Sequence, residues 1–139
     1  MECLIENDGI DHINVYSKGR TRLGRLLSNF AWTPFDHPEY GYFKTVEGFW
    51  YWIITGKDEF RYLPGYKCKE KGKKEINIRE YPNKEELKIA YKYKLQFNPE
   101  IYDLLKENKL PFEHYYVYGN KKIKAIEWEW TAKLWNELL

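Results

Sequence analysis

One acidic side chain stands at the head of a run of aromatic residues. Glu47 begins the stretch EGFWYW, residues 47–52. If residues 46–55 form a helix, then Trp50, Tyr51 and Ile54 lie three, four and seven positions after the glutamate and share its helical face. A carboxyl group beside apolar rings loses hydration, so its pKa rises toward neutrality, where it serves as an acid or a base. The structural alternative is that a first-turn glutamate only stabilises the helix dipole.

A second group of polar residues is crowded between aromatic ones in GRLLSNFAWTPF, residues 24–35. Ser28 and Asn29 precede Phe30 and Trp32 there. Polar groups in an apolar wall orient ligands, so these two side chains are candidate binding residues. Short polar side chains in loops also bond to nearby backbone, which is the alternative interpretation.

Other combinations point to chemistry less specifically. The stretch YKCKEKGKK, residues 66–74, holds five lysines and one tyrosine, which suits a solvated helix face better than a nucleic-acid site. The three histidines, at positions 12, 37 and 114, are widely spaced, and no set of cysteines or carboxylates completes a metal site around them. We therefore expect no metal site and no bound cofactor.

Composition limits the class of protein. With 139 residues the chain fits one domain, and the 23 basic against 21 acidic residues give a net charge of only +2, which does not indicate a nucleic-acid binder. Aromatic residues make up 19% of the chain, an excess that suits either a ring-lined pocket or an aromatic core. Cys3 and Cys68 lack metal-type spacing, and no apolar run is long enough to span a bilayer. We expect a reduced, cytoplasmic protein that has no membrane segment and no obligate protein partner.

Local patterns predict the elements that position these residues. Thr45 and Gly56 are typical of the two ends of a helix over residues 45–56, and Asn83 is typical of the start of another helix over residues 83–97. The remaining expectations are a strand in residues 12–17, a basic loop over residues 18–24, a short helix after Pro64, a helix from Pro99, a hairpin turning at residues 119–120 and a final amphipathic helix. Together they predict one α+β domain over residues 1–139, mostly helical with a few short strands.

The order of several motifs resembles the NADAR family, also called YbiA-like. Residues 16–52 contain the Leu-Ser-Asn-Phe element at residues 27–30 and a Tyr-x-x-Thr-x-Glu element at residues 42–47. CKEKGK, residues 68–73, and KLQFNPEIYDLLKENKLPFEHYYVYG, residues 94–119, resemble later parts of the same family. The resemblance covers most of the chain, and its specificity is concentrated in the first two elements.

The resemblance implies chemistry on N-glycosidic bonds of ribose, including removal of ADP-ribose from guanine in nucleic acid. Breaking such a bond develops positive charge on the sugar, which a carboxylate stabilises, and Glu47 is the candidate for this role. Phe30 and Trp50 would stack on a base, and Ser28 and Asn29 would bind ribose hydroxyls or the base edge. The basic residues Arg20, Arg22 and Arg25 suit a pyrophosphate, although a solvated basic loop is an equal alternative.

The sequence also departs from that family. The family has a lysine, implicated as a nucleophile toward the opened sugar, seven residues after the glutamate, and Ile54 stands there in this chain. The Glu-His pair of the family has become Glu47-Gly48, and the glycine-rich motifs near the carboxyl end are absent. Lys57 and Lys69 are the possible substitutes for the missing amine.

Two functions therefore stay open. One is a divergent hydrolase of ADP-ribosyl or ribosyl N-glycosides that depends on Glu47. The other is a binding protein that holds an ADP-ribose-like nucleotide without turnover, and the apolar Ile54 at the lysine position favours it. The short, tyrosine- and lysine-rich composition resembles a phage protein, which would place it in the host cytoplasm and connect it with countering host ADP-ribosylation.

Overall fold

The computed structural model describes residues 3–75 and 81–138. It is 48% helical and 15% strand, so the α+β class with predominant helix is confirmed. The chain divides into two compact units, one made of residues 29–100 and the other of residues 1–28 together with residues 101–139. We call these the central unit and the terminal unit. The expectation of a single domain stays a prediction.

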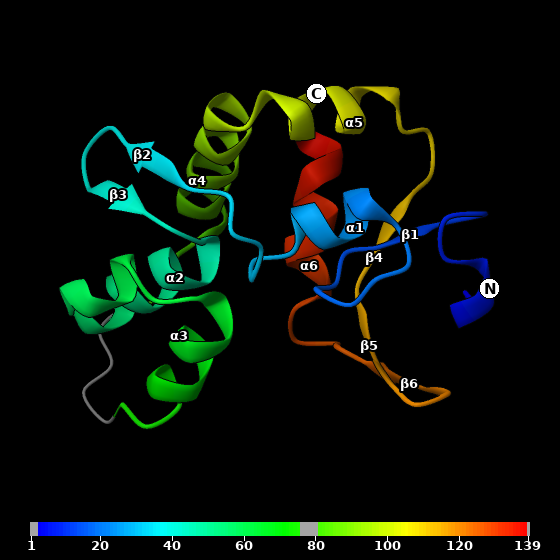
Figure 1. Cartoon of the computed structure of the whole chain (residues 1–139), viewed down its shortest axis with the longest axis horizontal. Helices are drawn as coiled ribbons and strands as arrows, with labels where there is room; N and C mark the ends of the chain where they lie inside the picture. Colours follow the sequence, from blue (N-terminus) through cyan, green and yellow to red (C-terminus); the bar gives the residue numbers. More distant parts are fainter. Residues whose placement is uncertain (1–2, 76–80, 139) are drawn as a thin grey trace. The chain divides into compact units, whose positions relative to one another are not determined.

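The central unit is built from three helices and a short hairpin (Figure 1). Its helices are α2 (Val46–Thr55), α3 (Gly65–Gly72) and α4 (Lys84–Phe97), and a 3-10 helix spans Asp58–Arg61. Strands β2 (Phe35–His37) and β3 (Gly41–Phe43) pair antiparallel and precede α2. The helices expected over residues 45–56, after Pro64 and over residues 83–97 are confirmed.

Aromatic side chains fill the core of the central unit. Phe35, Phe43, Phe49 and Phe60 are all buried, and the rings of Phe43 and Phe49 meet edge to face with centroids 5.3 Å apart. Edge-to-face contacts of this kind add about 0.5–1.5 kcal/mol beyond the area that the rings bury. Part of the aromatic excess in the sequence is therefore structural.

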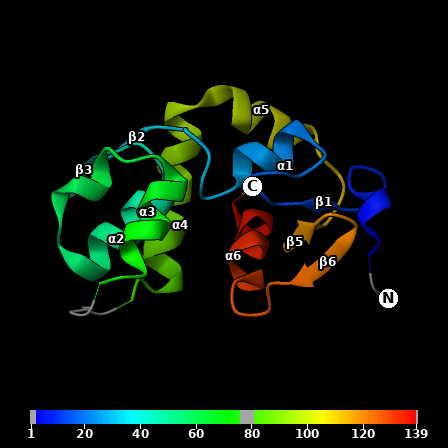
Figure 2. The same cartoon turned by 60° about the horizontal axis from the view of Figure 1, so that its bottom comes forward.

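The terminal unit joins the two ends of the chain. Strand β1 (Ile13–Asn14) pairs in parallel with β4 (Phe112–Glu113) (Figure 1). The antiparallel hairpin of β5 (Tyr115–Tyr118) and β6 (Lys121–Lys124) follows directly (Figure 2). The remaining helices are α1 (Arg22–Leu27), α5 (Pro99–Glu107), whose first two residues belong to the central unit, and α6 (Glu129–Lys133). The strand in residues 12–17, the helix from Pro99 and the hairpin turn at Gly119, with φ of +61°, are confirmed.

Two expectations for the terminal unit need correction. The basic loop expected over residues 18–24 ends early, because Thr21 accepts a hydrogen bond from the backbone N–H of Gly24 at 2.9 Å and starts helix α1. The final helix is short, since α6 has only five residues and continues as a 3-10 helix, Leu134–Glu137. Over residues 3–75 and 81–138, no helix has the length and apolar character needed to cross a membrane.

Candidate active site

The backbone at the start of α2 fixes the position of Glu47. The Thr45 hydroxyl oxygen accepts a hydrogen bond from the Gly48 N–H at 2.9 Å, and Gly56 ends the helix with φ of +73°. Glu47 is the second residue of the helix, and its own N–H donates to the carbonyl oxygen of Asn29 at 2.9 Å. The two stretches that the sequence singled out, around residues 29 and 47, therefore meet in the central unit.

Burial changes the acidity of Glu47. Its side chain is half-buried, while Trp50 and Ile54 on the same helical face are buried. Loss of hydration raises the pKa of the Glu47 carboxyl from 4.5 to about 7, and the positive charge of Lys69 acts in the opposite direction without cancelling it. Both the protonated and the ionised carboxyl are thus populated near neutral pH.

Two glycines near Glu47 let neighbouring backbones meet at close range: Gly48 in α2 against the 3-10 helix, and Gly65 in α3 against Phe30. A Cβ atom on Gly48 would lie 2.3 Å from the carbonyl oxygen of Phe60, and one on Gly65 would lie 2.6 Å from the Cα of Phe30. The first contact explains why residue 48, directly after Glu47, is a glycine. The second brings the start of α3 against Phe30.

Lys69, on α3, interacts with both Glu47 and Phe30. Its charge acts on the Glu47 carboxyl, and its Nζ lies 5.7 Å from the centroid of the Phe30 ring. Lys69 and Phe30 are both half-buried and so retain some contact with solvent. The structure therefore brings four of the candidate residues together: Asn29, Phe30, Glu47 and Lys69.

Helix α4 adds two residues that the sequence interpretation did not single out as functional. The Tyr91 hydroxyl donates to Oδ1 of Asn29 at 2.8 Å, which holds the Asn29 side chain. Lys94, one turn later on the same helix, is fully buried, and burial lowers the pKa of its ammonium from 10.5 to about 7. Helical periodicity in the sequence could have predicted the burial of Lys94, because position 94 falls on the buried stripe that contains Leu87 and Tyr91.

Exposed aromatic rings and lysines lie in the segments that neighbour or contact Phe30. Trp32, Tyr62 and Tyr66 are 73%, 62% and 60% exposed. The Nζ of Lys44 lies 4.8 Å from the Trp32 ring centroid, and the Lys44 backbone N–H donates to the Arg61 carbonyl next to Tyr62. We call Trp32, Lys44, Tyr62, Tyr66 and Lys67 the ring–lysine surface. Trp32 follows Phe30 by two residues, and Tyr66 follows Gly65, whose backbone contacts Phe30.

Several candidate residues of the central unit lie elsewhere or pack inward. Lys57 follows the far end of α2 from Glu47, and its Nζ forms an ion pair with Glu75 at 2.8 Å. Trp50 is only 8% exposed and packs against Tyr81 with centroids 6.0 Å apart, so little of its ring can stack on a base. Lys69, rather than Lys57, is therefore the substitute lysine that the structure places beside Glu47.

Four further candidates belong to the terminal unit. Ser28 is the buried residue that ends α1. The Arg25 guanidinium donates to the carbonyl oxygens of Gly19 and Arg20, and the Arg20 guanidinium donates to the Glu6 carbonyl at 2.7 Å. Arg22 is exposed in the first turn of α1. Two of the three arginines thus hold the loop before α1, which is a structural role.

The chain was compared with known proteins. No protein-family model, no curated protein and no solved structure matches it. Within residues 3–75 and 81–138, no three histidine, cysteine, aspartate or glutamate side chains gather as metal ligands would.

Proposed function

We propose that this chain is a divergent N-glycosidase that hydrolyses ADP-ribosyl or ribosyl N-glycosidic bonds through Glu47. The observation that carries the proposal is a half-buried carboxyl, pKa about 7, beside a half-buried lysine and an aromatic ring. A family relationship to NADAR proteins forms part of the same proposal and rests on the motifs of residues 16–52.

The acidity of Glu47 suits both halves of such a reaction. As the bond to the base breaks, positive charge grows on the anomeric carbon, and an ionised carboxylate next to it lowers the energy of the transition state. The same carboxylate then accepts a proton from the attacking water. A group with a pKa near 7 changes between its two forms at little cost at neutral pH.

Lys69 is the amine proposed for this site. It is the lysine whose charge reaches Glu47, and it also lies beside the Phe30 ring. Its ammonium can pair with negative charge on a departing base or on a phosphate. Tyr91 holds the Asn29 side chain by a hydrogen bond, so the amide is pre-oriented for a ribose hydroxyl or a base edge.

The ring–lysine surface favours a substrate carried on nucleic acid over a free nucleotide. Bases stack on exposed aromatic rings with about 1–3 kcal/mol each, and lysines attract the phosphates between them. Lys44 and Lys67 accompany Trp32 and Tyr66 on this surface. A strand bound there would bring a modified base close to Phe30 and Glu47.

A second candidate function is binding without turnover. Ile54 is 2% exposed on the face that carries Glu47, so the family's lysine position holds a core residue here. A protein that binds an ADP-ribosylated base and cannot release it would still shield the modification. The two candidates differ only in whether product forms.

The experiment incubates the chain with single-stranded DNA carrying ADP-ribosylated guanine and, separately, with free ADP-ribose. Product is followed by mass spectrometry and binding by thermal shift. We expect unmodified guanine DNA and ADP-ribose as products, lost in Glu47→Gln and retained in Glu85→Gln, an exposed glutamate at the same second position of α4. A thermal shift without product supports the binding protein, and neither signal with either ligand refutes both functions.

A further inference from the structure

The terminal unit contains a cavity that the proposed function does not use. Its volume is about 300 Å³, at the lower end of pockets that hold small molecules. Its lining residues come from four segments of the chain and are predominantly charged or polar: Cys3, Glu113, His114, Tyr115, Lys122, Lys124 and Glu129.

The strand register explains why these residues share one cavity. In the β5–β6 hairpin, Tyr115 lies opposite Lys124, and Val117 lies opposite Lys122. Alternate residues of a strand point to the same face, so both lysines stand over the face that carries Tyr115, about 7 Å apart along β6. Glu113 lies two positions before Tyr115, and Glu129 is the first residue of α6.

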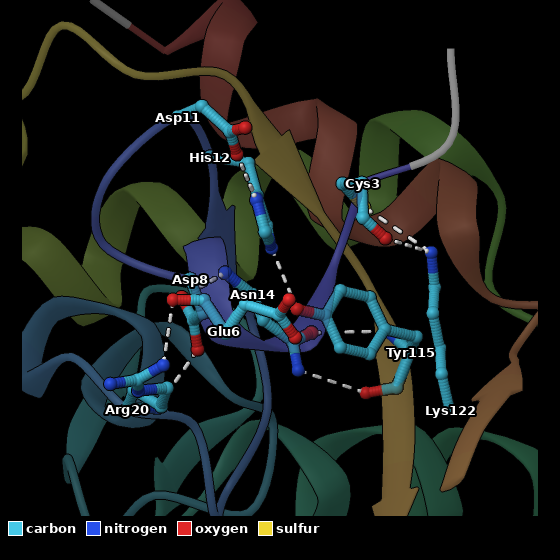
Figure 3. A network of polar contacts seen from close by, with 9 residues as sticks. All are labelled: Cys3, Glu6, Asp8, Asp11, His12, Asn14, Arg20, Tyr115 and Lys122. Atoms are coloured by element: carbon cyan, nitrogen blue, oxygen red, sulfur yellow. Dashed lines mark hydrogen bonds and ion pairs between the residues drawn. The ribbon is translucent and has the colours of Figure 1, made fainter.

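Tyr115 forms a fixed floor for this cavity. Its hydroxyl lies 2.6 Å from Nε2 of His12, whose Nδ1 lies 2.6 Å from Asp11 (Figure 3). Both Tyr115 and His12 are 2% exposed. The Asn14 side chain exchanges two hydrogen bonds with the Tyr115 backbone, which fixes the start of β5.

Lys122 lies along the Tyr115 ring and extends to Cys3 (Figure 3). Its Nζ is 4.8 Å from the ring centroid, 2.7 Å from the Cys3 carbonyl oxygen and 3.4 Å from the Cys3 Sγ. The ammonium is therefore held at one wall of the cavity. Lys124, opposite Tyr115, is exposed and belongs to the same rim.

The charges of the lining select the ligand class. Two lysines and two glutamates cancel, so a ligand that carries only negative or only positive charge meets repulsion from one pair. An apolar ligand would bury charged side chains without offering them an opposite charge or a hydrogen bond. A molecule with a carboxylate and an ammonium offers an opposite charge to both the lysines and the glutamates.

We propose that this cavity binds a small zwitterion of the amino-acid or dipeptide class, with its carboxylate at Lys122 and Lys124 and its ammonium at Glu113 and Glu129. The site lies within the terminal unit and involves none of the residues around Glu47, so its test is independent of glycosidase activity.

The test uses alanyl-alanine as the probe, measured by calorimetry with the full chain. Two blocked forms, N-acetyl-alanyl-alanine and alanyl-alanine amide, each lack one charge, and inorganic phosphate tests for a simple anion site. Alkylation of Cys3 by iodoacetamide gives a second readout, with the fully buried Cys68 as the unreactive reference. We expect alanyl-alanine to bind and to slow Cys3 alkylation, and each blocked form to bind at least about tenfold more weakly, as expected when one charged contact is lost.

Variants with matched controls locate the site. Lys124→Met should weaken alanyl-alanine binding about tenfold, whereas Lys121→Met, on the opposite face of β6, should leave it unchanged. Glu129→Gln should weaken it similarly, and exposed Glu127→Gln should not. Blocked forms that bind as well as the zwitterion, phosphate that binds more tightly, equal effects of the two lysine variants, or no binding at ~10 mM would each overturn the proposal.

Discussion

Replacing Glu47 with glutamine should stabilise the folded chain while removing the proposed glycosidase activity. Glutamine has nearly the size and shape of glutamate but does not ionise, so the variant avoids placing a charge in the half-buried position at the start of α2. A raised pKa means that folding opposes ionisation of this carboxyl. Gain of stability with loss of function is typical of a residue kept for chemistry.

The pKa change sets the magnitude and the pH window. In the unfolded chain the carboxyl loses its proton near pH 4.5, whereas in the folded chain it keeps the proton until about pH 7. Between these values the unfolded state becomes progressively favoured, and above pH 7 the full difference corresponds to about 3 kcal/mol, at 1.36 kcal/mol per tenfold change in proton affinity. The side chain is not fully buried, so solvent screens part of this penalty and we expect about 2 kcal/mol.

The assay is urea unfolding of the wild type and the variant at pH 4 and pH 8. We expect Glu47→Gln to be more stable by about 2 kcal/mol at pH 8 and equal to the wild type at pH 4, where both side chains are neutral. Glu85→Gln is the matched control, because Glu85 is exposed at the equivalent position of α4. Its loss of the dipole interaction should destabilise by about 0.3–1 kcal/mol at pH 8, the opposite sign. If Glu47→Gln is also destabilised at pH 8, burial does not control this carboxyl and the reasoning is wrong.

Three further outcomes follow from contacts in the central unit. Lys94→Met should be more stable than the wild type below pH 7. The gain should shrink as the pH rises from 7 to 10.5, since in that window the lysine is charged only in the unfolded chain. Thermal unfolding at a series of pH values measures this difference in stability. Tyr91→Phe removes the hydrogen bond to Asn29 and should cost about 0.5–1.5 kcal/mol in urea unfolding, together with a fall in kcat. Gly48→Ala pushes a Cβ against the Phe60 carbonyl and should cost about 1–3 kcal/mol, seen as a lower Tm; an unchanged Tm would mean that the two backbones separate freely.

Features set by neighbouring residues could be predicted from the sequence. Helix α2 begins and ends where Thr45 and Gly56 indicate, because a cap hydrogen bond and a left-handed residue are local properties. Aromatic residues flank both Glu47 and Asn29 in the sequence, and this pattern predicted that Glu47 would be buried near Asn29. Thr21 is a typical helix N-cap and could have predicted the start of α1. The flanking glycines, at positions 19 and 24, favoured a loop instead.

Features set by distant contacts could not be predicted. The parallel pairing of Ile13 with Phe112 joins the two ends of the chain, and short strands carry no sequence signal for a partner so far away. The roles of Tyr91 and Lys94 depend on what α4 packs against, which helical periodicity alone does not specify. Position 94 falls on the buried stripe of α4, but the stripe expected from the sequence holds apolar and aromatic residues, because a lysine is rarely buried.

The division of the chain into two units affects the order in which they fold during synthesis on the ribosome. Residues 29–100 are continuous, so the central unit can complete its contacts soon after α4 is synthesised. Strand β1 is synthesised about 100 residues before its partner β4, so residues 13 and 14 stay unpaired until residue 113 has been added. Glu47 and its neighbours can thus be assembled while the cavity under Lys122 and Lys124 does not yet exist.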